Sequence, residues 1–435
     1  MENKRVWIET YGCQQNVADS EILLGMAEEL GYRQAQARED ADLILFNTCA
    51  VRENAELKVY GNLGALKHLK AKKPGLVIGV CGCMMQEEAA AARIKKTYPH
   101  IDLVFGTHAL YKFPALLTKV LDKQERVFDL TEDHAIHEGL PIHRGNAVTA
   151  YISIMYGCNN FCTYCIVPYV RGRERSREPE AVLRDIRQAA ADGYKEIMLL
   201  GQNVNSYRYG FADILEQAAA VPGIARIRFM TSHPKDISTQ VLDVMASHKN
   251  ICNSLHLPLQ AGSNRVLSAM NRRYTRESYL EIVRKARERM PGLTLTTDII
   301  VGFPGETNEE FLETLDMIER VRYDSIFSFI YSKRSGTPAA AMPDVLTGAE
   351  KKANFDRLLE VQNRISKEIN DGYLGSVQTV LAEGESKTNP AVMTGRTEGG
   401  KVVNFTSRQP VKPGQLVTVA ITQAKTWSLE GEQTE

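Results

Sequence analysis

The stretch Gly157-Cys158-Asn159-Asn160-Phe161-Cys162-Thr163-Tyr164-Cys165 places three cysteines in one short loop with the spacing CxxxCxxC. Such a loop delivers three thiolates to three irons of a four-iron cubane and leaves the fourth iron without a protein ligand. An iron with an open position is reactive. The alternative is a zinc site, which needs a fourth ligand, and the nearest histidine upstream is His143. The spacing therefore favours an iron–sulfur cluster.

The size and composition of the chain are those of a globular protein with several domains. It has 435 residues, of which 43% are hydrophobic and 24% are charged, so we expect roughly two to four domains. Residues 1–6 carry no export signal and no apolar run approaches the ~20 residues of a membrane helix, which predicts a soluble, cytoplasmic protein. Its eight cysteines then favour metal or redox chemistry over disulfides. With 53 basic and 53 acidic residues the net charge is zero, so any RNA contact must come from local patches.

Residues 1–122 are predicted to form an open α/β sheet domain, because short apolar runs alternate with segments of helical periodicity. Sheets of this kind bind their ligands at the carboxyl ends of the strands. The predicted strands are Val6–Glu9, Leu43–Phe46, Leu76–Val80 and Leu103–Phe105, and the predicted helices are Ser20–Leu30, Ala55–Lys70 and Gln86–Lys96.

Cysteines follow three of these strands, so the topology predicts that they converge on one crevice. Cys13 follows the first strand and Cys49 the second, while Cys81 and Cys83 compete for the third position. We choose Cys83 because it lies near the start of a predicted helix, where the dipole favours a thiolate. Cys81 is interpreted as a small buried hydrophobe, and Cys252 likewise. Cys13, Cys49 and Cys83 are therefore candidate ligands of a second cluster.

Residues 123–147 are charged, contain histidines and Pro141, and are predicted to be a linker. Regular alternation resumes over residues 148–371 and predicts a partial (β/α)6 barrel. Because the CxxxCxxC loop follows its first strand, the cluster is placed at the barrel mouth, where such barrels hold their active residues. The predicted strands are Ala150–Ile154, Glu196–Leu200, Arg226–Met230, Ser254–Leu257, Leu295–Val301 and Ser325–Ile330; the predicted helices are 179–193, 211–220, 239–248, 274–290 and 308–321.

The tips of the other barrel strands are polar or rich in glycine. Gly201-Gln202-Asn203 follows the second strand, and Val301-Gly302 ends the fifth. Glycine lets the backbone approach a ligand closely. Turn formation explains each glycine separately, but a ligand site also explains why the polar residues share one rim. The further members of that rim are Ser232, His233 and Gln260.

The C-terminal part, residues 372–435, follows a long predicted helix at 349–374 and changes in composition. Five short strand patterns separated by Gly, Pro and Asn predict a small antiparallel β-barrel of the oligonucleotide-binding type. Phe405 and Trp427 are candidate stacking residues, and core packing explains both equally well. The predicted strands are 377–382, 392–395, 402–405, 416–422 and 427–429.

A basic run, Arg171-Gly172-Arg173-Glu174-Arg175-Ser176-Arg177, lies a few residues beyond the cysteine loop. Arginines at this place are where a phosphate-bearing substrate would pass. A second basic run, Lys67 to Lys73, ends a predicted helix, where lysines complement the helix dipole, so we interpret it as a solvated face.

With these motifs in order, the chain resembles the methylthiotransferases of the radical S-adenosylmethionine (radical SAM) superfamily over essentially its whole length. The C-terminal barrel resembles the TRAM domain, an RNA-binding module. Within the superfamily the basic run and Asn47–Ala55 are most similar to those of the tRNA 2-methylthio-N(6)-dimethylallyladenosine synthases. Enzymes acting on threonylcarbamoyl-adenosine in tRNA are the alternative, and those acting on a ribosomal protein are less favoured because their basic segment differs. The matching stretches are Tyr11–Asn16, Asn47–Ala55, Gly79–Cys83, Cys158–Cys165 and Ile166–Arg177.

The resemblance implies a transferase that places a methylthio group on C2 of a prenylated adenosine beside the anticodon of tRNA. It implies two [4Fe-4S] clusters and SAM: one cluster on Cys158, Cys162 and Cys165, the other on Cys13, Cys49 and Cys83. It also implies a reductant of the flavodoxin or ferredoxin type. Two competing classes are an RNA-binding protein with structural zinc and an electron carrier. The predicted SAM-contacting residues are Tyr164, Gly201, Gln202 and Val301, and the residues predicted to bind the anticodon stem-loop are Arg171, Arg173 and Arg175.

Overall fold

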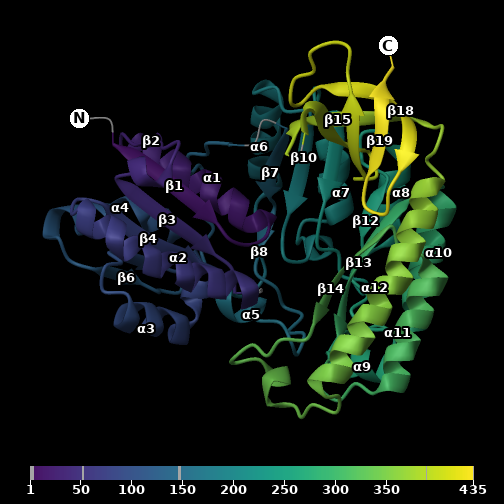
Figure 1. Ribbon diagram of the computed structural model, residues 1–435, viewed down its shortest axis with the longest axis horizontal. Coiled ribbons are helices and arrows are strands. Elements are labelled where there is room, and N and C mark those ends of the chain that lie inside the picture. Colours follow the sequence, from purple (N-terminus) through teal and green to yellow (C-terminus); the bar gives the residue numbers. More distant parts are fainter. Residues whose placement is uncertain (1–3, 51–52, 146–147, 388, 435) are drawn as a thin grey trace. The chain divides into compact units, whose positions relative to one another are not determined.

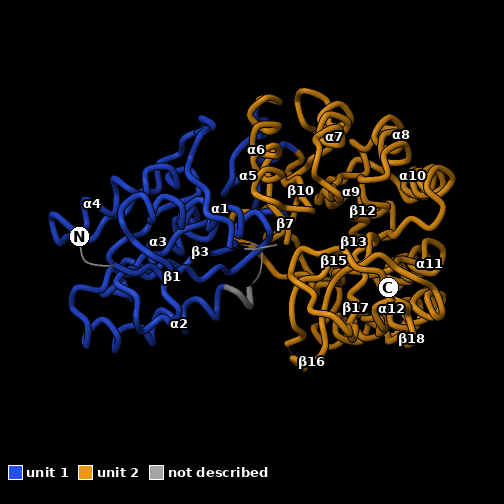
Figure 2. The backbone as a smooth tube through the Cα atoms, turned by 90° about the horizontal axis from the view of Figure 1, so that it is seen from above, with its two compact units in different colours: residues 1–145, 155–159, 165–177 blue, residues 146–154, 160–164, 178–435 orange. Residues whose placement is uncertain are grey.

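The computed structural model describes residues 4–50, 53–145, 148–387 and 389–434. The chain divides into two compact units, shown in different colours in Figure 2. Unit 1 comprises residues 1–145, 155–159 and 165–177, and unit 2 comprises residues 146–154, 160–164 and 178–435. Residues 51–52 of one cysteine motif and residues 146–147 of the predicted linker lie outside the described part.

Unit 1 is built on a six-stranded, all-parallel sheet in the order β2-β1-β3-β4-β5-β6. Its central strands β3 and β4 are buried along their whole length, as expected for parallel strands with helices on both faces. The strands are β1 (Arg5–Thr10), β2 (Arg33–Gln34), β3 (Leu43–Thr48), β4 (Val77–Gly82), β5 (Leu103–Phe105) and β6 (Val127–Asp129).

Two hydrophobic cores lie on the two faces of this sheet. Leu43 and Leu45 of β3 face the core built with α1 (Gln14–Glu29) and α4 (Phe113–Lys123). Ile44 and Phe46, one residue out of phase, face the core built with α2 (Glu53–Lys72) and α3 (Glu88–Thr97). This alternation follows from the two-residue period of a strand.

Two features of unit 1 differ from the sequence prediction. Val127–Asp129, within the segment predicted to be a linker, is strand β6 and pairs in parallel with β5. The helix α4 was not predicted, although Pro114 stands in its first turn, where proline is favoured. The sheet domain therefore continues past residue 122.

Unit 2 contains the predicted partial barrel as two parallel three-stranded sheets, β7-β10-β11 and β12-β13-β14. An isolated bridge between Ile227 and Ile251 links β11 to the segment that precedes β12. Helices α10, α11 and α12 lie along one side of β12–β14 (Figure 1). The strands are β7 (Thr149–Ser153), β10 (Glu196–Leu200), β11 (Arg226–Phe229), β12 (Ser254–His256), β13 (Thr294–Val301) and β14 (Ser325–Ile330); the helices are α6 (Pro179–Ala191), α7 (Phe211–Ala219), α8 (Thr239–Ser247), α9 (Asn264–Ala269), α10 (Arg276–Arg289), α11 (Asn308–Val321) and α12 (Gly348–Asp371).

The C-terminal strands close into a barrel in the order β15-β16-β17-β19-β18, which confirms the predicted small β-barrel. Its pairings are antiparallel as predicted except one, because β17 and β19 pair in parallel. Phe405 is fully buried in its core, so core packing accounts for this residue, whereas Trp427 is exposed. None of the described helices is long and apolar enough to cross a membrane. The barrel strands are β15 (Val377–Ser386), β16 (Asn389–Thr397), β17 (Val402–Thr406), β18 (Leu416–Ala424) and β19 (Leu429–Gln433).

Candidate cluster sites and substrate face

The carboxyl ends of β1, β3 and β4 bring three cysteines of unit 1 together. A Cβ atom added at Gly12, next to Cys13, would lie 2.9 Å from Cβ of Cys49. The thiol of Cys83 is close enough to both cysteines for each to raise its pKa. The three predicted ligands of the second cluster therefore converge, although they are separated by 70 positions in the chain.

Asparagines at the same edge hold the first two cysteine segments in place. Cys13 is the N-cap of α1, and its Sγ lies 3.4 Å from Oδ1 of Asn16. The Asn16 amide donates to Asn47 Oδ1 at 3.1 Å and to the Thr48 carbonyl at 3.2 Å, immediately before Cys49. Both asparagines are buried, so these hydrogen bonds have little competition from water.

Cys83 begins a short 3-10 helix directly after Gly82. Gly82 has φ +95°, which strains any other residue, and a Cβ there would lie 2.4 Å from the Thr48 carbonyl oxygen. Burial raises the pKa of the Cys83 thiol to about 12, an effect that the nearby guanidinium of Arg171 partly opposes. Cys81, two residues earlier, packs into the hydrophobic core of the sheet. Cys83 is also buried, but it packs with Ala50, Ile166 and Val170 outside that core, and its role as a ligand stays a prediction.

The donor set at this edge suits a cluster better than a single ion. Among the described residues, no three Cys, His, Asp or Glu side chains are arranged to hold one metal ion. A single zinc ion draws its ligands around one centre, whereas each thiolate of a three-cysteine cluster site binds a different iron. Three converging thiols therefore fit the three protein ligands of a cubane with one open iron.

The cysteines of the CxxxCxxC loop are divided between the two units. In unit 1, the Cys158 amide donates to the carbonyl of Gly172 at 3.1 Å. In unit 2, Nη1 of Arg272 lies 3.4 Å from Sγ of Cys162, and Arg272 also donates to the carbonyl of Pro258 at 3.1 Å. Arg272 is buried, and sequence reasoning gave it no role. Cys165 is half-buried and belongs to unit 1.

Of the predicted SAM-contacting residues of unit 2, Gly201 and Gln202 follow β10 and Val301 ends β13, whereas Tyr164 lies in the cysteine loop. Tyr164 packs against a core cluster that includes Phe303. The carbonyl of Gly201 accepts a hydrogen bond from Thr231, and the carbonyl of Val301 accepts one from the Tyr331 amide. Gln202 is half-buried. Contact of these residues with SAM stays a prediction.

Burial shifts the pKa of two further residues near the rim, the predicted rim member His233 and Glu306. Burial lowers the pKa of His233 to about 2, with Arg272 adding to the effect, so this imidazole is neutral. Burial raises the pKa of Glu306 to about 7, although the Gly302 amide donates to this carboxylate at 2.6 Å.

The basic run after the loop is mostly engaged inside unit 1. Arg171 is only 6% exposed: Nη2 pairs with Asp19 at 2.7 Å and Nε lies 3.1 Å from Cys83 Sγ. This corrects the prediction that Arg171 anchors tRNA phosphates, because its guanidinium faces protein. Arg175 donates to the carbonyls of Asp133 and Arg171, both at 3.1 Å. Of the three predicted arginines, only Arg173 is exposed.

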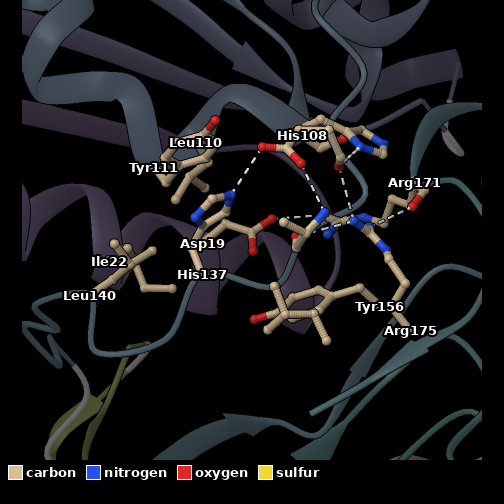
Figure 3. Close-up of a pocket in the computed structure, with 14 residues that line it drawn as sticks. Asp19, Ile22, His108, Leu110, Tyr111, His137, Leu140, Tyr156, Arg171 and Arg175 are labelled. Atoms are coloured by element: carbon tan, nitrogen blue, oxygen red, sulfur yellow. Dashed lines mark hydrogen bonds and ion pairs between the residues drawn. The ribbon is translucent and has the colours of Figure 1, made fainter.

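Arg171 and Arg175 also line a polar pocket of unit 1 (Figure 3). The rings of Tyr111 and His137 stack there with centroids 3.5 Å apart, and the backbone carbonyl of Asp133 accepts from Nδ1 of His108 at 2.5 Å. The pocket is therefore built largely from the segment predicted to be a linker and from the basic run.

One face of β12–β14 carries exposed aromatic side chains, and sequence reasoning missed it. The register places Asp298 beside Phe327 and Ile300 beside Phe329. Phe327 and Phe329 are 46% and 44% exposed, whereas Leu295, Ile299 and Val301 on the other face of β13 are buried. The ring of His256 meets Phe327 edge to face at 5.7 Å and its Nε2 lies 3.5 Å from Asp298. This open face, made by His256, Asp298, Ile300, Phe327 and Phe329, combines the exposed rings of Phe327 and Phe329 with Asp298 and the buried His256.

Comparisons with known proteins agree with this architecture. Residues 152–318 match the radical SAM superfamily, residues 5–106 match the uncharacterized protein family UPF0004, and residues 372–434 match the TRAM domain. Solved structures with the same fold include the radical SAM methyltransferase TsrM from Kitasatospora setae, with TM-score 0.57, 14% identity and coverage of 87% of this chain and 80% of that chain. The fold and the cysteine loop define a radical SAM enzyme.

Relatives narrow this class. The tRNA-2-methylthio-N(6)-dimethylallyladenosine synthase of Acetivibrio thermocellus is 55% identical over 99% of this chain and 91% of its own length. The enzyme of the same name from Clostridioides difficile is 52% identical over 99% and 91%. This chain belongs to the tRNA-2-methylthio-N(6)-dimethylallyladenosine synthase family. The predicted family, enzyme class, fold class, and cofactors ([4Fe-4S] clusters and SAM) are thereby confirmed.

Proposed function

We propose that this chain methylthiolates C2 of N(6)-dimethylallyladenosine beside the anticodon of tRNA, with one cluster on Cys158, Cys162 and Cys165 and a second on Cys13, Cys49 and Cys83. The observation that carries this assignment is the convergence of Cys13, Cys49 and Cys83 at one sheet edge, with Cys81 turned into the core. When bound, the clusters and SAM would supply the radical chemistry and the sulfur needed to replace the hydrogen of the unactivated C2–H bond.

The residues of the chain have separate tasks in this proposal. The buried arginines Arg171 and Arg272 each place a guanidinium N–H on the sulfur of one cysteine, Cys83 and Cys162 respectively. Hydrogen bonds to ligand sulfurs are among the factors that set the potential of an iron–sulfur cluster. The neutral His233 at the barrel rim leaves that rim free of an additional positive charge.

The open face of β12–β14 supports the prenylated substrate over the alternative one. A dimethylallyl group is apolar and gains stability against Phe327, Ile300 and Phe329. A threonylcarbamoyl group carries a carboxylate, which Asp298 repels. This face therefore favours dimethylallyladenosine as the base that enters the barrel.

We assign the RNA contacts to Arg173 and to the C-terminal barrel. Arg173 is the exposed member of the predicted set, and the barrel carries the exposed Trp427, whose indole offers a stacking surface. We assign the supply of electrons to a small reductant of the flavodoxin or ferredoxin type, because radical chemistry at a cluster needs an external electron donor.

Iron content tests the ligand assignment. The reconstituted chain is expected to hold about eight irons. Replacing Cys158, Cys162 and Cys165 by alanine should leave about four irons and abolish SAM cleavage, whereas replacing Cys13, Cys49 and Cys83 should leave about four irons and retain SAM cleavage without methylthiolation.

Matched controls are Cys81→Ala and Cys252→Ala, which should both keep the full iron content because these buried thiols pack in protein. If Cys81→Ala lost iron while Cys83→Ala retained it, Cys81 and not Cys83 would be the cluster ligand. SAM cleavage by the triple variant of the CxxxCxxC loop would refute the assignment of that cluster.

A further inference from the structure

Arg171 is held at the second cysteine set by two buried contacts. Its Nη2 pairs with Asp19 at 2.7 Å, and its Nε points at Sγ of Cys83 at 3.1 Å. Both Arg171 and Asp19 are almost completely buried, and Figure 3 shows their side chains directed toward one another. The carboxylate therefore fixes which nitrogen of the guanidinium is left to face the sulfur.

A guanidinium suits this place for a geometric reason. Its planar fork presents N–H groups in fixed directions, so one cation can hold a carboxylate and a sulfur at the same time. A lysine at position 171 provides the charge without that fork. The ion pair with Asp19 satisfies the charge of Arg171 without any contact to sulfur. The additional Nε contact to Cys83 therefore points to a role at this thiol.

The residue after Arg171 contacts the other cysteine set. The Gly172 carbonyl accepts the amide of Cys158 at 3.1 Å, and a Cβ added at Gly157 would lie 2.5 Å from that same carbonyl oxygen. The dipeptide Arg171-Gly172 thus contacts Cys83 through its side chain and Cys158 through its backbone. All of these residues belong to unit 1.

We propose that Arg171, oriented by Asp19, is a positioning residue that raises the reduction potential of the cluster on Cys13, Cys49 and Cys83. The inference rests on the ligand assignment made above. A hydrogen bond and a positive charge at a ligand sulfur stabilise the more negative, reduced cluster, which raises its potential. The Arg171 side chain contacts Cys83, whereas Cys158 is contacted only by the backbone of Gly172. A substitution of the Arg171 side chain is therefore expected to change the second cluster more than the first.

The test measures the midpoint potential of that cluster alone. The full-length chain with Cys158, Cys162 and Cys165 replaced by alanine keeps only this cluster, and a redox titration followed by electron paramagnetic resonance gives its potential. In this background Arg171→Gln is expected to shift the potential to a more negative value. Arg171→Lys should shift it in the same direction by less, because the positive charge remains but the planar fork that holds both Asp19 and the sulfur is lost.

The matched control is Arg177→Gln, which removes a buried arginine of the same run paired with Glu138 and should leave the potential unchanged. If Arg171→Gln loses its iron, the Arg171→Lys titration decides. A potential equal to the background in whichever of these variants retains about four irons would overturn the inference. A Cys83→Ala chain that keeps this cluster would instead refute the ligand assignment, so the two failures are distinguishable.

Discussion

Arg226, on β11, donates through Nη1 to the main-chain carbonyl of Arg396 in the C-terminal barrel, at 2.8 Å. Its Nη2 reaches the carbonyl of Thr379, also at 2.8 Å, and the neighbouring Arg228 donates to the carbonyl of Thr397 at 2.9 Å. Both arginines are largely shielded from water. Within unit 2 the barrel is therefore fastened to the sheet by charged hydrogen bonds that are independent of the side chains on β15 and β16.

Replacing Arg226 by alanine should loosen this attachment. A hydrogen bond from a charged donor contributes about 1.5–3 kcal/mol to stability. The substitution also leaves two buried carbonyls without this donor. We expect a lower free energy of unfolding and faster proteolysis near Gly372. Arg396→Ala is the control, since it removes exposed contacts: a pair with Glu383 worth about 0–1 kcal/mol and a hydrogen bond to the Gly400 carbonyl. Equal effects of the two substitutions would contradict this role for Arg226.

The strands of the partial barrel were predictable to within one residue at each end, because buried parallel strands leave short apolar runs bounded by polar tips. The cysteine sites were predictable for the related reason that strand ends meet at one edge. β6 was missed because a three-residue edge strand leaves too short a pattern. By contrast, α4 was predictable, since Pro114 favours a helix start and Leu116, Leu117 and Val120 recur at helical spacing.

The roles within the basic run were not predictable in the same way. Alternating arginines look alike in sequence, and burial of Arg171 depends on Asp19 and Cys83, which lie 152 and 88 positions away. The open face of β12–β14 escaped prediction because Phe327 and Phe329 fit an ordinary buried strand. The register of β13 and β14 and the exposed fractions of the two rings reveal this face only in the structure.

Gly82→Ala should disturb the position of Cys83. The backbone conformation at Gly82 costs another residue about 1–3 kcal/mol, and the added methyl would meet the Thr48 carbonyl at 2.4 Å. We expect a lower free energy of unfolding and reduced iron content. Gly64→Ala, at an exposed position of α2 with open space around it, should instead stabilise the chain by about 0.5–1 kcal/mol. A fully loaded Gly82→Ala chain would refute the steric argument.

Glu21 should make the stability of the chain depend on pH. Burial raises the pKa of this α1 carboxyl from 4.5 to about 7, and neither oxygen has a hydrogen-bond partner among the described residues. Between these two values the folded chain holds a proton that the unfolded chain has lost, so stability falls as pH rises from 4.5 to 7. Glu21→Gln should remove up to about 3 kcal/mol of that fall. Urea denaturation at several pH values measures it, and parallel curves for the two proteins would count against this assignment.

Arg173→Glu should weaken tRNA binding and reduce the slope of log affinity against log salt by about one or more, as expected when a phosphate contact is lost. Arg173 is chosen because it is exposed, whereas Arg171 is buried. Filter binding across a salt series is the measurement. Arg187→Glu, at an exposed position of α6, is the matched charge reversal and should leave the slope unchanged. The same salt slope for Arg173→Glu and the parent chain would place the RNA path elsewhere.

Phe327→Ala should reduce discrimination for the prenyl group of the substrate. Phe327 presents nearly half of its surface on the open face, and loss of its contact with a dimethylallyl group removes about 1–3 kcal/mol, or roughly a tenfold or larger change in affinity. The expected result is weaker binding of prenylated tRNA with unchanged binding of the same tRNA lacking the prenyl group. Leu374→Ala removes an equally exposed apolar side chain beyond α12 and should change neither affinity. Equal loss for both tRNAs in Phe327→Ala would show that the ring supports the fold of the barrel rather than the recognition of the substrate.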